Sequence, residues 1–239
     1  MAELAEMRLT PSSAPYTIVY DYWNASVAAA ARAEVQGLLR LCHERGEGGD
    51  NRTLGASRLA RQWPDRFPLV LSFERDPVLR QRAAAQLRRP SVAVDTLASV
   101  TGPGAASGGG WHKDNLAPGV KALVYLDAVT QHNGPFTMLL GYDDRRVAAL
   151  PGRGGRRYSE AAVARAVAEG ARTRALLAPA GTVIVFETSS IHRGAPALSG
   201  VRHALTNYYE NTPNRCPLRP SLPMRGAPPS AHATRWPRG

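Results

Sequence analysis

Residues 181–210 read GTVIVFETSSIHRGAPALSGVRHALTNYYE. This stretch holds two runs rich in β-branched, aromatic and other apolar residues, 181–190 and 201–210, with Gly, Pro and Ser between them. Such runs predict β-strands joined by turns. Three further short runs of the same kind lie upstream, at 90–100, 120–129 and 135–140. Many short strands separated by turn residues are typical of a β-sandwich or barrel, so residues 91–210 are expected to form a β-rich core.

The N-terminal part of the chain has the pattern of helices. In the segment 26–44, apolar residues recur at i, i+3, i+4 and i+7 and define one helical face: Val35, Leu38, Leu39 and Cys42. A second helix is expected over 75–89, where Asp76 can cap the N-terminus and Pro77 can occupy the first turn. Its inward face is expected to carry Val78, Leu79, Ala83 and Leu87. A strand at 16–23 precedes both helices.

The order of the elements predicts one domain of mixed type. Helices come first, in residues 1–90, and strands follow in 91–210, whereas alternating strands and helices would predict a parallel sheet. The β-rich half is interrupted by a helical insertion at about 143–178, which Ser159 is placed to open. We therefore expect an α+β, mainly β domain over 1–210, with a β-core supported by N-terminal helices.

The formal net charge of +11 raises the question of nucleic acid as a partner, because a basic protein attracts phosphates. Only two of the 30 basic residues are lysines, Lys113 and Lys121, and this excess of arginine fits the codon bias of a GC-rich genome. Five arginines and seven prolines fall in 211–239, which is predicted to be an extended or disordered basic tail. A small-molecule substrate is therefore favoured over nucleic acid.

Targeting signals and cysteines favour a cytoplasmic protein. The N-terminus lacks the basic start and apolar stretch of a secretory signal. No apolar run approaches the roughly 18 residues that a membrane-spanning helix needs. Cys42 and Cys216 are too far apart in sequence for a CxxC zinc site and too few for a disulfide framework, which favours a reducing compartment. The sequence does not indicate an oligomeric state.

The stretch GGGWHKDN, residues 108–115, contains a His-x-Asp step formed by His112 and Asp114. On a strand, residues i and i+2 point to the same face, so this imidazole and this carboxylate can share one cation. Two ligands are too few for a tight site, and His192, at the end of a predicted strand, offers a third. Two histidines and one carboxylate form the facial triad that binds non-haem Fe(II) and leaves positions open for substrate chemistry.

An arginine follows the third candidate ligand at a useful distance. Arg202 comes ten residues after His192, at the start of the next predicted strand. Thr206 lies on the same face of that strand, so both side chains can point into the cavity of the metal. A guanidinium offers a two-pronged fork for a carboxylate. An iron triad with a carboxylate anchor is a site suited to a 2-oxo acid.

Three stretches together carry a family resemblance: GGGWHKDN, KALVYLDAVTQHNGPF and AGTVIVFETSSIHRGAPALSGVRHALTNYY. The sequence resembles the Fe(II)/2-oxoglutarate-dependent dioxygenases, specifically the phytanoyl-CoA dioxygenase-like branch, over about residues 92–210. The resemblance implies a double-stranded β-helix (jelly-roll, cupin-like) core with iron on His112, Asp114 and His192. It also implies that Arg202 binds the distal carboxylate of 2-oxoglutarate, and that O2 is the oxidant, with ascorbate supporting activity. After NGPF the chain departs from the family pattern and reads TMLLGYDDRR, which leaves the substrate open.

Four further residues are candidates for the pocket. Lys121 lies on the strand after the metal motif and either reaches 2-oxoglutarate or substrate, or is a solvated strand residue. Tyr125 is on the same face as Lys121 and either lines the cavity or fills the core. Trp111 is a candidate substrate contact, with core packing as its alternative. Arg193 is another, with a surface role as its alternative.

These residues predict a hydroxylase of a small molecule, such as a bacterial natural product or an amino-acid-derived intermediate. Desaturation uses the same chemistry. Halogenating relatives replace the carboxylate ligand with a small residue so that chloride can bind, so the presence of Asp114 favours hydroxylation. The alternatives are oxidative demethylation of nucleic acid, ligand binding by a non-catalytic jelly-roll, and a cupin-like metal enzyme without a co-substrate.

Overall fold

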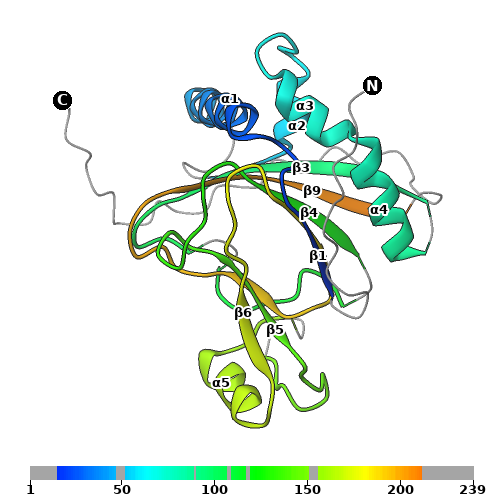
Figure 1. The fold of residues 1–239 in the computed structure, drawn as a ribbon, viewed down its shortest axis with the longest axis vertical. Helices are drawn as coiled ribbons and strands as arrows, with labels where there is room; N and C mark the ends of the chain where they lie inside the picture. Colours follow the sequence, from blue (N-terminus) through cyan, green and yellow to red (C-terminus); the bar gives the residue numbers. More distant parts are fainter. Residues whose placement is uncertain are drawn as a thin grey trace.

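The computed structural model describes residues 15–46, 52–88, 90–106, 109–116, 119–150 and 156–211. Two antiparallel sheets face each other, with most helices above the larger sheet and one helix below the smaller (Figure 1). The expected combination of N-terminal helices and antiparallel strands is confirmed. Residues 1–14 and the predicted basic tail from 212 onward lie outside the described residues. Within the described part of the chain, no helix is long and apolar enough to cross a membrane.

The larger sheet has six strands in the order β1-β7-β4-β9-β3-β2. Every neighbouring pair in it is antiparallel. The longest pairing joins β3 to β9 and contains one irregularity between Ala93 and Asp95. The strand bounds are β1 Tyr16–Val19, β2 Arg52–Leu54, β3 Ser91–Thr101, β4 Val120–Tyr125, β7 Val183–Glu187 and β9 Arg202–Asn211.

The smaller sheet has three strands in the order β6-β5-β8. Its strands are β5 Phe136–Leu140, β6 Arg172–Ala175 and β8 His192–Gly194. The helix α5, Glu160–Ala168, lies against the far side of this sheet (Figure 1). Ser159 caps α5 by accepting a hydrogen bond from the Ala162 N–H at 3.0 Å, so its predicted role at the start of this helix is confirmed. Past the helix, however, the predicted helical segment becomes strand β6.

Four helices cover the outer face of the larger sheet (Figure 1). They are α1 Ala25–Glu44, α2 Ala56–Ala60, α3 Pro68–Arg75 and α4 Pro77–Leu87. The apolar face predicted for α1 is confirmed, since all four of its residues are buried. Asp76 caps α4 as predicted by accepting from the Leu79 N–H at 2.8 Å. Val78 is expected to face inward, but it is exposed, because the buried face of α4 contains Leu79 and Ala83 and the preceding residue points about 100° away from it.

Side chains of β4 point alternately to the two faces of the sheet, so this strand contributes to two hydrophobic cores. Val120, Ala122 and Val124 belong to the core between the larger sheet and the helices. Leu123 and Tyr125 belong to the core between the two sheets. Successive side chains of a strand point to opposite faces, so Lys121 is directed to the inter-sheet side as well. A buried lysine therefore enters the space between the sheets.

Candidate metal centre

The three predicted metal ligands are held together by backbone pairing. The His112 N–H donates to the His192 carbonyl at 2.8 Å, and the His192 N–H donates to the His112 carbonyl at 2.9 Å. The Asp114 N–H donates to the Thr188 carbonyl at 2.9 Å, which aligns the end of the motif with the loop after β7. The His-x-Asp segment thus extends along β8, and its i and i+2 side chains share a face.

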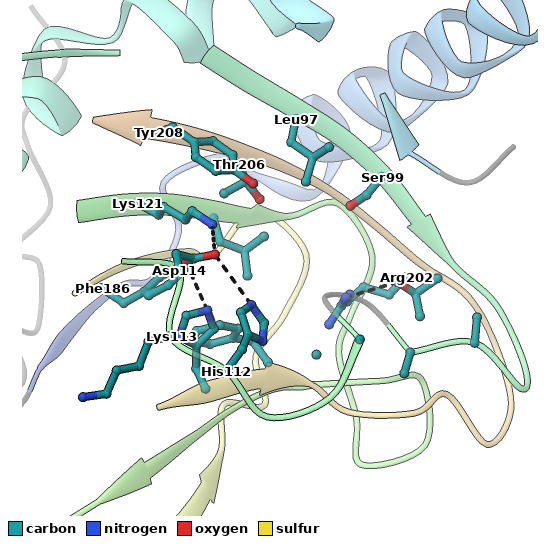
Figure 2. Close-up of a pocket in the computed structure, with 18 of the residues that line it drawn as sticks. Leu97, Ser99, His112, Lys113, Asp114, Lys121, Phe186, Arg202, Thr206 and Tyr208 are labelled. Carbon is teal, nitrogen blue, oxygen red and sulfur yellow. Dashed lines mark hydrogen bonds and ion pairs between the residues drawn. The ribbon is translucent and has the colours of Figure 1, made fainter. Parts of the chain in front are cut away.

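The side chains of this triad converge. Figure 2 shows two of them, His112 and Asp114, directed toward each other. His192 Nε2 lies 3.2 Å from Asp114 Oδ2, and His112 Nε2 lies 3.6 Å from Asp114 Oδ1. One ligand atom from each residue falls within 4.8 Å of the others. His112 and His192 are buried and Asp114 is half-buried, so a cation here would be largely shielded from water. The site can hold a metal ion.

Hydrogen bonds assign the protons of both imidazoles. His112 Nδ1 lies 2.8 Å from the Gly110 carbonyl oxygen, and His192 Nδ1 lies 2.8 Å from the Ser190 carbonyl oxygen. A carbonyl can only accept, so each Nδ1 carries a proton and each Nε2 is the nitrogen that faces Asp114. A proton or a metal cation between each Nε2 and the carboxylate makes this arrangement favourable. The Nδ1 hydrogen bonds thus orient both Nε2 atoms as ligands for a metal ion.

Electrostatics give the ligands the charges that a divalent metal requires. Burial raises the pKa of Asp114, but the His112 and His192 imidazoles and the Lys121 ammonium outweigh it and hold that pKa below the usual range. Burial also lowers the pKa of His192, which keeps the ring neutral. Asp114 Oδ2 is buried and accepts no well-directed hydrogen bond from the described residues. This oxygen is available to a metal ion.

Aromatic rings fix the orientation of His192. Its ring centroid lies 5.3 Å from that of Phe136 and 5.1 Å from that of Phe186. The two phenylalanines also contact each other, with centroids 4.4 Å apart. They come from β5 and β7, so both sheets contribute to one apolar wall behind the ligand. Sequence reasoning missed both residues, since an apolar residue in a short strand carries no signal beyond core packing.

A cavity of about 600 Å³ opens at the triad. Its lining includes all three candidate ligands together with Lys121, Arg202 and Thr206. The two sheets and the segment around the metal motif contribute its walls. A space of this size accommodates a small co-substrate and part of a small substrate. The structure thus brings together the residues predicted to hold iron and those predicted to hold 2-oxoglutarate.

Arg202 is buried in the wall of this cavity. Its Nη1 donates to the Gly134 carbonyl and its Nη2 donates to Thr101 Oγ1 at 3.2 Å. Gly134 has a φ of 78°, and a Cβ there would lie 2.9 Å from the Ala195 carbonyl oxygen, so this turn requires glycine. Burial lowers the pKa of the Arg202 guanidinium. An anion bound against this cation would offset the cost of burying it.

The other predicted pocket residues divide into two groups. Lys121 reaches the metal centre, with Nζ 2.7 Å from Asp114 Oδ1. Tyr125 lies outside the cavity lining, because its fully buried hydroxyl donates to the Leu176 carbonyl at 3.0 Å and accepts from the Phe136 N–H at 3.0 Å. These contacts support core packing, the stated alternative for Tyr125, over a contact with substrate.

Trp111 and Arg193 are also placed outside the cavity lining. The Arg193 guanidinium lies over the Trp111 ring, 4.3 Å from its centroid, and both side chains bond Glu160 at the start of α5. Each residue adjoins a candidate ligand in the sequence, so strand alternation directs it to the opposite face. These contacts support the stated alternatives, packing for Trp111 and a surface role beside an acidic residue for Arg193, over contact with substrate.

Tyr208 is a cavity residue that sequence reasoning missed. Its ring centroid lies 4.0 Å from Lys121 Nζ. The alternation that placed Arg202 and Thr206 on one face of β9 extends to residue 208, so this signal was present in the sequence. His203 faces the other way as the same rule predicts, and there its Nδ1 bonds Asp127 Oδ2 at 2.8 Å.

Comparisons with known proteins define the class of fold. No protein-family model matches the chain, and no curated protein matches its sequence. Among solved structures, the chain is similar to AviO1 from Streptomyces viridochromogenes Tue57, with a TM-score of 0.61 and 20% identity over 86% of this chain and 93% of that one. EctD from S. alaskensis with 2-oxoglutarate and 5-hydroxyectoine matches with a TM-score of 0.61 and 16% identity, over 82% of this chain and 72% of that one.

HygX from Streptomyces hygroscopicus with iron bound matches with a TM-score of 0.58 and 15% identity, over 83% of this chain and 82% of that one. The similar structures also include SnoK, described as a non-haem α-ketoglutarate-dependent carbocyclase from nogalamycin biosynthesis. The chain therefore has the fold found in non-haem iron, 2-oxoglutarate-dependent oxygenases. Its structural neighbours include proteins with iron and with 2-oxoglutarate bound.

Proposed function

We propose that this protein is an Fe(II)- and 2-oxoglutarate-dependent oxygenase that hydroxylates a C–H bond of a small molecule, on a double-stranded β-helix core. One observation carries the proposal: two imidazoles and a carboxylate converge in the same cavity that a buried arginine lines. Fe(II) is the metal that suits two histidines and one carboxylate with open positions. The arginine supplies the partner that a dicarboxylic co-substrate needs.

In this proposal each residue has a defined task. His112, Asp114 and His192 hold the metal, and the Nδ1 protons of both rings keep the Nε2 lone pairs directed at it. Arg202 binds the distal carboxylate of 2-oxoglutarate, and its bonds to Gly134 and Thr101 fix the guanidinium before the co-substrate arrives. Thr206 is a second polar contact on the same strand face.

When bound, the iron supplies the oxidation chemistry, coupling decarboxylation of 2-oxoglutarate by O2 to attack on a C–H bond of the substrate. The chain supplies binding, orientation and a wall that limits water. Phe136 and Phe186 make that wall apolar beside His192. No side chain needs to transfer a proton in this scheme.

The neighbours support a small-molecule substrate. EctD is described with 5-hydroxyectoine, a small hydroxylated compound, and SnoK with nogalamycin biosynthesis. Because SnoK is a carbocyclase, the same fold serves more than one outcome, and hydroxylation is the outcome that we propose here. The cavity of roughly 600 Å³ accommodates a small molecule beside the co-substrate.

An anaerobic titration tests the cofactors before any substrate is known. Protein with Fe(II) should develop a visible charge-transfer band when 2-oxoglutarate is added, and admission of O2 with ascorbate should then yield succinate. Pools of small natural products and amino-acid derivatives would next be screened for faster succinate formation. A protein that binds Fe(II) and 2-oxoglutarate but never consumes O2 would be a ligand-binding jelly-roll. A protein that binds no Fe(II) would contradict the proposal.

A further inference from the structure

Lys121 holds its ammonium group between a metal ligand and an aromatic ring (Figure 2). Its Nζ lies 2.7 Å from Asp114 Oδ1 and 4.0 Å from the centroid of the Tyr208 ring. In the larger sheet Lys121 is directly opposite Tyr208 on β9 and Phe186 on β7. Cross-strand neighbours of this kind have side chains on one face, so two aromatic residues flank the lysine stem.

Burying this ammonium is costly. The Lys121 side chain is only 8% exposed, and a buried cation is tolerated only when it is paired. An apolar residue of the same length would fill the same space between Tyr208 and Phe186 at no electrostatic cost. Stability therefore does not explain the charge. The ion pair with Asp114 is the feature that distinguishes lysine from such a residue.

The two oxygens of Asp114 have different surroundings. Oδ1 accepts the Lys121 ammonium, whereas Oδ2 is buried, lies 3.2 Å from His192 Nε2 and accepts no well-directed hydrogen bond from the described residues. A carboxylate can bind a cation through one oxygen or through both. With Oδ1 already engaged by an ammonium group, Oδ2 is the oxygen left for the metal.

We propose that Lys121 is a positioning residue that holds Asp114 in one-oxygen coordination and so keeps a coordination position open for the co-substrate. This inference rests on the metal centre proposed above. Two imidazoles and one oxygen occupy three of six positions, whereas a two-oxygen carboxylate would occupy a fourth. 2-Oxoglutarate chelates through two atoms and O2 needs one, so all three remaining positions are required.

The test uses the Co(II)-loaded full chain, because the visible spectrum of Co(II) reports its coordination number without turnover. In Lys121→Met the stem is kept and the charge removed. Its Co(II) spectrum without 2-oxoglutarate should shift from that of the unmodified protein. Co(II) should bind at least as tightly, since a repelling cation is gone. The dissociation constant for 2-oxoglutarate should rise about tenfold or more, the usual scale for a residue that orients a metal ligand.

Two variants make the result specific. Lys121→Arg retains a cation beside Oδ1 and should give a spectrum close to that of the unmodified protein. Lys113→Met removes the other lysine, whose Nζ pairs with Asp144 at 2.5 Å, and should leave the Co(II) spectrum unchanged. Thermal unfolding of each variant monitors folding, and a Lys121→Met protein that unfolds early is replaced by Lys121→Gln.

An unchanged Co(II) spectrum in a folded Lys121→Met protein overturns the inference. If 2-oxoglutarate binding also weakened in that case, Lys121 would contact the co-substrate directly. Weaker Co(II) binding with an unchanged spectrum would show a structural role and would overturn it as well. Failure of the unmodified protein to bind one equivalent of Co(II) is a separate outcome, because it contradicts the proposed metal centre itself.

Discussion

His112 and His192 form a hydrogen-bonded antiparallel pair, in which the N–H of each residue donates to the carbonyl of the other at 2.8 and 2.9 Å. Residues paired in this way have side chains on the same face, and here the ring centroids are 4.5 Å apart. Asp114, two residues beyond His112, joins them on that face. Backbone pairing thus sets the triad before any metal binds.

Because the two rings supply two of three ligands, His192→Ala should abolish tight metal binding. We expect loss of at least two orders of magnitude in Fe(II) affinity, estimated from the strength of individual metal ligands and their supporting residues. Equilibrium titration with Fe(II) under anaerobic conditions measures it. His132→Ala is the matched control, since His132 is exposed and lies outside the cavity lining. Full succinate formation by His192→Ala would remove this residue from the metal centre.

Arg202→Ala should weaken binding of 2-oxoglutarate and leave the affinity for the metal nearly unchanged. Loss of a partly buried charge partner typically costs about 2–5 kcal/mol, so the KM for 2-oxoglutarate should rise tenfold or more. Steady-state kinetics at saturating Fe(II) measure the change. Arg193→Gln is the control arginine, because its guanidinium lies over Trp111 outside the cavity, and its KM should stay unchanged. Equal effects of both variants would show that the response reflects general charge loss.

Two glycine substitutions test the close approach of Gly181, before β7, to Trp23, before α1. Gly181 has a φ of 85°, and a Cβ there would lie 1.8 Å from the Trp23 carbonyl oxygen. Gly141 has a φ of 68° but no atom within 4 Å of such a Cβ. Gly141→Ala should therefore cost only backbone strain, about 1–2 kcal/mol of unfolding free energy. Gly181→Ala should cost clearly more in urea unfolding, and equal losses would refute the clash.

How far the sequence predicts this site depends on strand alternation. Side chains on a strand alternate between its two faces, which directs Arg202 and Thr206 toward the cavity and His203 away from it. The structure agrees on all three. The same rule, applied to the neighbours of the two ligands, would have directed Trp111 and Arg193 to the far face, where they lie. Proximity to a ligand in the sequence therefore does not place a side chain on the ligand's face of a strand.

Other parts of the structure lacked a local signal. Strand β6 is exposed along its whole length and has no apolar alternation, so it resembles the end of the helix before it. The helix α2 has only five residues, too few to show a helical period. The pairing of Lys121 with Asp114 depends on how the metal motif packs against β4, which no local pattern in the sequence shows. Such contacts are fixed by the fold, not by spacing along the chain.

Deletion of residues 216–239 tests whether the basic charge serves nucleic acid. The deletion removes four arginines and no acidic residue, which lowers the formal charge from +11 to about +7. Strand β9 ends at Asn211, so no residue that the structure describes is lost. We expect unchanged O2 consumption and succinate formation with Fe(II), ascorbate and 2-oxoglutarate, because the metal centre and its cavity stay intact. An oxygraph and a succinate assay measure both.

We expect only weak binding to duplex DNA or RNA, both with and without residues 216–239. A nucleic-acid demethylase would instead lose affinity on deletion, and its binding would depend less steeply on salt, since phosphate contacts release counterions. Gel-shift titrations at several salt concentrations, with and without residues 216–239, separate these cases. Tight, steeply salt-dependent binding by the full chain that is lost on deletion would favour the nucleic-acid substrate. We expect the small-molecule result, because the excess of arginine over lysine fits codon bias rather than a phosphate-binding surface.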